Sequence, residues 1–138
     1  MEGKVNVTVR SAVTVDDQHE LICQTGKGRV DHDESGWRLR YVTHDAAGEK
    51  SQSDIRLTQA GASVRNCLAG YTMDLHPGET TQAGVRTPYG TIDLTIATQR
   101  VHWDLEGEQE GKLTFEYTLL SGGQEVSHLT VGVQLSKE

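Results

Sequence analysis

The chain has 138 residues, 35% hydrophobic and 24% charged, a composition that suits one globular domain over residues 1–138. Its 20 acidic residues outnumber the 13 basic ones, and the net charge of −7 disfavours nucleic acids and anionic membranes as partners. No apolar run is long enough for a signal core or a membrane span, so we expect a cytoplasmic protein.

Alternation of apolar and polar residues predicts short strands along the whole chain, whereas no segment shows helical periodicity. Polar or glycine-containing turns, such as Asp16-Asp17 and Pro77-Gly78, separate these strands. Gly26 and Gly28 interrupt the second strand, where we expect a bend or a bulge. The strands predicted in the first half of the chain occupy residues 5–10, 19–30, 37–42, 53–59, 64–68 and 71–75.

The clearest strand signal follows the corner Thr87-Pro88-Tyr89-Gly90. Proline presets φ at the second position of a turn and glycine relieves the fourth, so we interpret this corner as structural. The strand after it places Ile92, Leu94 and Ile96 on one face, which we expect to be buried. A break is predicted near Gln99-Arg100, and further strands cover residues 101–105, 113–119 and 129–135.

The predicted architecture is all-β. Short strands at intervals of about 8–12 residues are typical of a sandwich or a barrel. Nearly all predicted connections are tight hairpins, which favours a single antiparallel, mostly up-and-down barrel of about 8–10 strands over a sandwich with long crossovers.

Three parts of the sequence resemble the YwiB-like family of small bacterial proteins of unknown function. The most specific part is the corner and strand with the residues Thr87, Pro88, Tyr89, Gly90, Ile92, Leu94, Ile96 and Thr98. The spacing of Arg65, Met73 and Gly78 upstream is also similar, as is the ending Gly123, Gln124, Val126 and Ser127. The resemblance implies a calycin-type, lipocalin-like barrel and no established activity. The chain departs from the family pattern at Cys67 and Val85.

A barrel of this size holds either packed side chains or one small ligand. With only 5% aromatic residues, the interior is expected to be under-filled, which favours a cavity. The predicted ligand-wall residues are Trp37, Leu39, Tyr41, Phe115 and Tyr117. Tyr89 is a candidate for the barrel mouth. Arg65 would anchor an acidic head group if it faces inward, and would be solvated if it faces outward.

Two functions follow from these residues. The first is a non-enzymatic binder of a small apolar or amphipathic ligand, and the alternative is a structural or protein-interaction domain with a packed barrel, including a possible homodimer. An enzyme is the least favoured, since nucleophile and phosphate-loop motifs are absent. The histidines lack metal-ligand spacing, so we expect neither metal nor cofactor. Cys23 and Cys67 are expected to be free thiols packed in the core.

Overall fold

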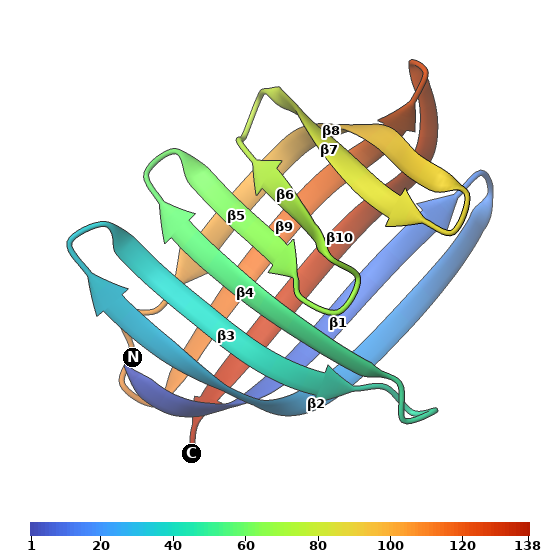
Figure 1. The fold of residues 1–138 in the computed structure, drawn as a ribbon. Coiled ribbons are helices and arrows are strands. Elements are labelled where there is room, and N and C mark those ends of the chain that lie inside the picture. Colours follow the sequence, from blue (N-terminus) through green and yellow to red (C-terminus); the bar gives the residue numbers. More distant parts are fainter.

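The computed structural model describes residues 1–138 and contains ten antiparallel strands in one sheet (Figure 1). Chain neighbours pair with each other throughout, except β6 with β7, and β1 also pairs with β10. The predicted up-and-down, all-β barrel is therefore confirmed. No helix is present that is long and apolar enough to cross a membrane. The strands are β1 (Gly3–Val15), β2 (Gln18–Asp33), β3 (Gly36–His44), β4 (Lys50–Thr58), β5 (Gly61–Asn66), β6 (Tyr71–Leu75), β7 (Thr80–Thr87), β8 (Gly90–Asp104), β9 (Glu110–Ser121) and β10 (Gln124–Lys137).

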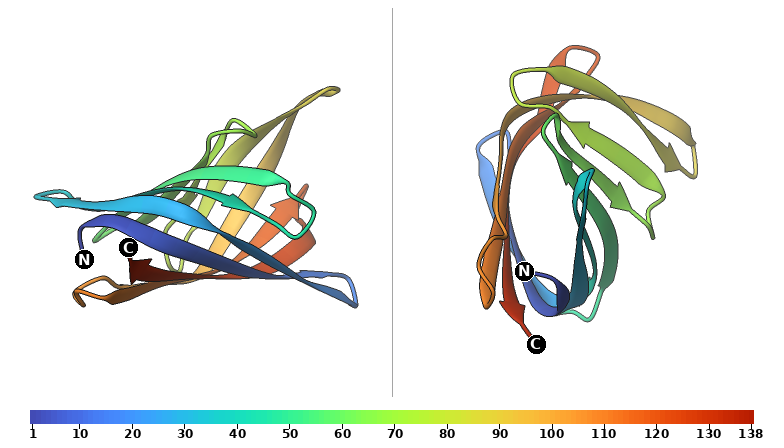
Figure 2. Two further views of the ribbon diagram at one scale, coloured as in Figure 1. Left: turned by 90° about the horizontal axis from the view of Figure 1, so that it is seen from below. Right: turned by 90° about the vertical axis from the view of Figure 1, so that its left-hand side faces the viewer.

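The barrel is flattened and nearly closed, and its gap lies in the middle of the chain, between β6 and β7 (Figure 2). The connection between these strands docks on β8, where Gly78 N–H donates to the Thr98 carbonyl at 2.9 Å and Thr98 N–H donates to the Glu79 carbonyl at 3.2 Å. The Thr81 hydroxyl also donates to the Asp74 carbonyl across the gap. Beyond these bonds β6 and β7 diverge, so each keeps one edge without a strand partner.

The core follows from the period of two in each strand. In β1, Val5, Val7 and Val9 point inward and are almost fully buried, while the residues between them face water. The same alternation in the other strands fills the end of the barrel where the two chain termini lie (Figure 1). The largest side chains buried there include Val30, Leu39, Leu57, Leu75, Leu105, Leu113 and Leu135.

The two glycines of β2 allow a very close approach of β3. A Cβ atom on Gly26 would lie 1.9 Å from the Val42 carbonyl oxygen, and one on Gly28 would lie 2.4 Å from the Arg40 carbonyl oxygen. Because no side chain fits at these distances, glycine lets the sheet fold sharply over this strand pair. The registers of β2 with β1 and with β3 run through Gly26 and Gly28 without a shift, so no bulge occurs there, and the two glycines instead permit this close approach.

The predicted corner and strand break both appear, with one difference in burial. The Thr87 hydroxyl donates to the Gly90 carbonyl at 2.7 Å and accepts from Tyr89 N–H at 3.2 Å, which closes the corner. The predicted break is a register shift between Thr98 and Arg100 within one long strand, β8. Ile96 is buried as expected, but Ile92 is 47% exposed, because the β7–β8 hairpin extends past the barrel wall.

Both cysteines are free thiols, as predicted. The expectation that they pack in the core is wrong for Cys23, which is exposed, and Cys67 is only half-buried. Cys23 alternates with the inward-facing Ile22 and Gln24, so its position in β2 places it on the outer face.

Candidate functional site

The two ends of the barrel interior differ. At the end near the termini, the Met1 ammonium donates to the Leu105 carbonyl at 2.7 Å, and Trp37 stacks on His32 with ring centroids 4.0 Å apart. Toward the other end, inward-facing side chains are only half-buried, although their register directs them to the inside. They are Val13, Ile22, Gln24, Tyr71, Leu94, Leu119, Leu129 and Val131. The interior is therefore packed at one end and open to solvent at the other.

Hydroxyl groups gather inside the barrel between these two ends. Tyr117 and Thr98 are direct cross-strand partners on β9 and β8, so their side chains lie next to each other on the inner face. Across the barrel, Tyr41 is paired with Ser53, Ser53 with Asn66 and Asn66 with Tyr71. We call the side chains of Tyr41, Tyr71, Tyr117 and Thr98 the hydroxyl cluster.

The Thr98 hydroxyl has no hydrogen-bond partner. The residue is only 3% exposed, and its Oγ1 is the buried side-chain polar atom without a partner in this structure. Leaving such a group unpaired costs free energy, because it has lost its hydrogen bonds to water. By contrast, the nearby buried Thr43 hydroxyl donates to Gln24 Oε1 at 3.2 Å. Thr98 also borders the register shift of β8, and such irregularities frequently lie beside functional sites.

The surroundings of the cluster oppose negative charge. Burial raises the pKa of Tyr117, and the neighbouring Tyr71 and Tyr41 raise it further. Burial also raises the pKa of Tyr41, an effect that Ser53 partly offsets by hydrogen bonding and that Tyr71 reinforces. Since Tyr71 affects both other phenols, the three rings share one region of the interior. The raised pKa values keep Tyr41 and Tyr117 neutral at physiological pH.

The inner face carries one basic residue, Lys137 at the end of β10, which is the register partner of the inward-facing Val5. Its exposed ammonium lies at the packed end and donates to the Glu2 carbonyl. Every other basic side chain on a strand points outward. The only carboxylate on the inner face is Glu20, which is exposed near the tip of the β1–β2 hairpin. The site is thus a neutral one, with hydroxyl groups set among aliphatic side chains.

Most of the predicted wall residues face this interior. Leu39, Tyr41, Phe115 and Tyr117 are buried there, and Trp37 is half-buried at the packed end. Their ligand-binding role stays a prediction. All four buried residues belong to the hydrophobic core, and Tyr41 and Tyr117 also belong to the hydroxyl cluster.

The other two predicted site residues lie outside the barrel. Arg65 is exposed on the outer face of β5, opposite the inward-facing Val64, and its register partner on β4 is the outward-facing Asp54. It therefore cannot anchor an acidic group in the interior. Tyr89 is fully exposed at the tip of the β7–β8 hairpin, not at the inner rim of the mouth.

Two members of the cluster were missed by sequence reasoning. Thr98 continues the inward series of Ile92, Leu94 and Ile96, so a polar residue on an apolar face was the available signal. Tyr71 shares its inward face with Met73 and Leu75 in the same way. Tyr71 does not reveal from sequence that it lies near Tyr117, because β6 and β9 are far apart in the chain. The pairing of Thr98 with Tyr117 depends on the register of the neighbouring strands β8 and β9, which shifts beside Thr98 and cannot be read from either strand alone.

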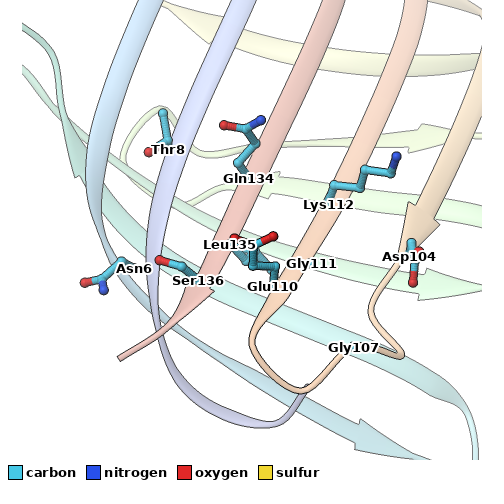
Figure 3. Close-up of a pocket in the computed structure, with 10 residues that line it drawn as sticks. All are labelled: Asn6, Thr8, Asp104, Gly107, Glu110, Gly111, Lys112, Gln134, Leu135 and Ser136. Atoms are coloured by element: carbon cyan, nitrogen blue, oxygen red, sulfur yellow. The ribbon is translucent and has the colours of Figure 1, made fainter.

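The outer surface has a groove of about 520 Å³ between β1, β10, β9 and the loop before β9 (Figure 3). Polar side chains from neighbouring strands line it, among them Asn6, Thr8, Lys112 and Gln134. It contains no buried polar atom that lacks a partner, so we do not assign it a function. No group of three or more His, Cys, Asp or Glu side chains could hold a metal ion.

Comparison with known proteins identifies a family and a similar solved structure. The family model described as "Domain of unknown function (DUF1934)" matches residues 7–132. The structure is similar to the crystal structure of the ywiB protein from Bacillus subtilis, with a TM-score of 0.83 and 18% sequence identity over 99% of this chain and 93% of that chain. This likeness concerns the fold alone, and it confirms the resemblance drawn from the sequence motifs. No curated protein matches the chain significantly.

Proposed function

Because the chain belongs to the DUF1934 family, which is described only as a domain of unknown function, we propose its function from the geometry of the barrel. The protein is a binder of one small, partly apolar molecule, held in the open part of the interior. The observation that carries this proposal is the buried, unpartnered Thr98 hydroxyl beside Tyr117. A few convergent polar groups in an apolar concave site are the usual pattern of a small-molecule pocket.

Aliphatic side chains flank the hydroxyl cluster and would contact the apolar part of such a molecule. Leu129 is the cross-strand partner of Tyr117, and Leu119 follows on the same inner face. Both are half-buried, so they have surface left to cover. Covering apolar surface contributes about 25 cal/mol per Å², which favours binding of a ligand that fills the space.

Native mass spectrometry of the protein purified from its own host tests this proposal. We expect an added mass that is released on denaturation. Leu129→Trp should fill the interior and abolish the added mass, while Thr130→Trp, on the opposite face of β10, should retain it. A bare chain of 15.1 kDa from all three proteins would contradict ligand binding.

A second candidate is an interaction domain, and one observation favours it. The outer faces of β2 to β5 carry a basic patch on this acidic chain, composed of Lys27, Arg29, Arg38, Arg40, Arg56 and Arg65. Arg29 lies opposite Arg40, and Arg38 lies opposite Arg56, on neighbouring strands. The two positive charges within each pair repel each other. Asp31 bonds Arg29 and Arg40, and Asp54 bonds Arg38 at 2.7 Å, which compensates only part of the charge. An acidic protein surface would complement the remainder.

Labelled polyglutamate is a suitable probe for the basic patch, with fluorescence anisotropy as the readout. We expect salt-sensitive binding that the double variant Arg56→Ala, Arg65→Ala weakens several-fold. The double variant Arg100→Ala, Lys112→Ala, on β8 and β9, should bind like the wild type. Tighter binding of a single-stranded RNA than of polyglutamate would overturn the choice of an acidic protein.

A further inference from the structure

We infer that the molecule held inside the barrel is uncharged and presents a hydroxyl or carbonyl oxygen to the hydroxyl cluster, an inference that rests on the proposed function. The sequence offered Arg65 as an anchor for an acidic head group only if that residue faced inward. With Arg65 on the outer face, no lysine or arginine lies at the hydroxyl cluster to neutralise such a group.

The first step of the argument concerns charge. A carboxylate or ammonium that enters an apolar interior loses its hydration, and this cost is large unless an opposite charge compensates it. The inward-facing cations, Lys137 and the Met1 ammonium, lie at the packed end, where they donate to the Glu2 and Leu105 carbonyls. Glu20, the one inward carboxylate, is exposed near a hairpin tip, away from Thr98, so no charged group compensates an ion at the hydroxyl cluster. The raised pKa values of Tyr41 and Tyr117 agree with this, since they report surroundings that oppose a negative charge. An uncharged molecule avoids the penalty.

The second step concerns hydrogen bonding. Each hydroxyl of the cluster donates one hydrogen bond and accepts others, so together they match a ligand oxygen, as hydroxyl or carbonyl. Thr98 Oγ1 has this capacity entirely unused. Tyr117, its neighbour in the register, likewise makes no hydrogen bond through its side chain that would compete with a ligand. A ligand oxygen placed between these two groups would satisfy the buried hydroxyl, and its apolar part would then lie against Leu119 and Leu129.

Three probes with one alkyl chain test the inference, namely octanol, octanoate and octylammonium. Each is titrated into the full chain near neutral pH by isothermal titration calorimetry. We expect octanol to bind at least about tenfold more tightly than either ion. Thr98→Val and Tyr117→Phe keep the side-chain shape and remove one hydroxyl each, so each should weaken octanol binding about three- to tenfold.

A second readout separates a ligand role of Thr98 from a structural one. Thr98→Val removes the unpaired buried hydroxyl, so it should raise the Tm of the ligand-free protein while it weakens octanol binding. A hydroxyl that supports the fold would lower the Tm instead. Thr130→Val, on the outer face of β10, is the control and should leave octanol binding unchanged.

The outcomes that overturn the inference differ from those that overturn the proposed function. Equal or tighter binding of octanoate, or octanol binding unaffected by both Thr98→Val and Tyr117→Phe, would overturn the inference and leave a ligand-binding barrel in place. If none of the three probes binds and the host-purified protein carries no added mass, the proposed function fails, and the inference with it.

Discussion

At the scale of single residues, the neighbouring side chains of Tyr117 and Thr98 have opposite effects on the stability of the fold. The Tyr117 ring is 6% exposed and packs in the core, so its apolar surface stabilises the barrel. The Thr98 hydroxyl beside it has no partner and opposes folding by the cost of its lost hydration. Residues that break a local packing rule in this way are the first place to look for function.

The pH dependence of stability should report the buried phenol of Tyr117. Its pKa is raised in the folded chain relative to the ordinary value of 10.0, so above that pH the unfolded state loses its proton first. The stabilising contribution is therefore complete below about pH 10 and declines as the pH rises further, by up to about 1.4 kcal/mol per pH unit. Urea unfolding at a series of alkaline pH values measures this decline.

Tyr117→Phe should show a smaller alkaline loss of unfolding free energy than the wild type. Tyr89→Phe, at the fully exposed hairpin tip, is the matched control and should follow the wild-type curve. Identical curves for all three proteins would show that Tyr117 does not hold its proton in the folded state more strongly than in the unfolded one.

At the scale of elements, β2 determines where the sheet folds over. It pairs with β1 over thirteen residue pairs, yet β3 covers only its second half, from Thr25 to Asp33. Gly26 lies near the start of that second half, where any Cβ atom would collide with the Val42 carbonyl oxygen of β3. The first half of β2 extends beyond β3, which leaves the inner faces of Ile22 and Gln24 half-exposed at the open end.

Gly26→Ala should destabilise the protein. The new methyl group would meet the Val42 carbonyl oxygen at 1.9 Å, so the two backbones must separate, at a cost of about 1–3 kcal/mol. Gly132→Ala in β10 is the control, since its methyl group would meet nothing closer than 3.9 Å, and we expect no loss. Chemical denaturation compares the two variants. Equal stability of Gly26→Ala and the wild type would show that the strands have room to move apart.

At the scale of the whole molecule, the first and last strands of the barrel are paired with each other, whereas β6 and β7, in the middle of the chain, are not paired. The pairing of β1 with β10 runs over ten residue pairs, and Glu138 N–H adds a bond to the Lys4 carbonyl at 3.1 Å. The gap between β6 and β7 is bridged only near the connection that joins them. Tyr71 on β6 and Thr98 on β8 flank this gap, so the gap lies beside the hydroxyl cluster.

Hydrogen exchange should reveal this asymmetry. We expect amides of β6 and β7 to exchange faster than those at the centre of β1 and β10, because an edge strand opens without breaking a second ladder. Mass-spectrometric exchange on the whole chain measures both regions in one experiment, with β1 and β10 as the internal reference. Equal protection in all four strands would mean that the gap is closed in solution.

The sequence by itself determined the elements and most facings, because alternation with a period of two depends only on neighbouring residues. It predicted the corner at 87–90, the irregularity near Gln99 and the inward faces of Trp37 to Tyr41 and Phe115 to Tyr117. It did not decide whether Arg65 faces inward or outward. The alternation of apolar and polar residues in β5 is short and lies beside two glycines, Gly61 and Gly70, so the inner face of this strand could not be identified from sequence. Only the tertiary structure brought Tyr41, Tyr71, Tyr117 and Thr98 together and assembled the basic patch. Both depend on the register between strands, and register arises from packing and backbone hydrogen bonds across the whole sheet rather than from the pattern within one strand.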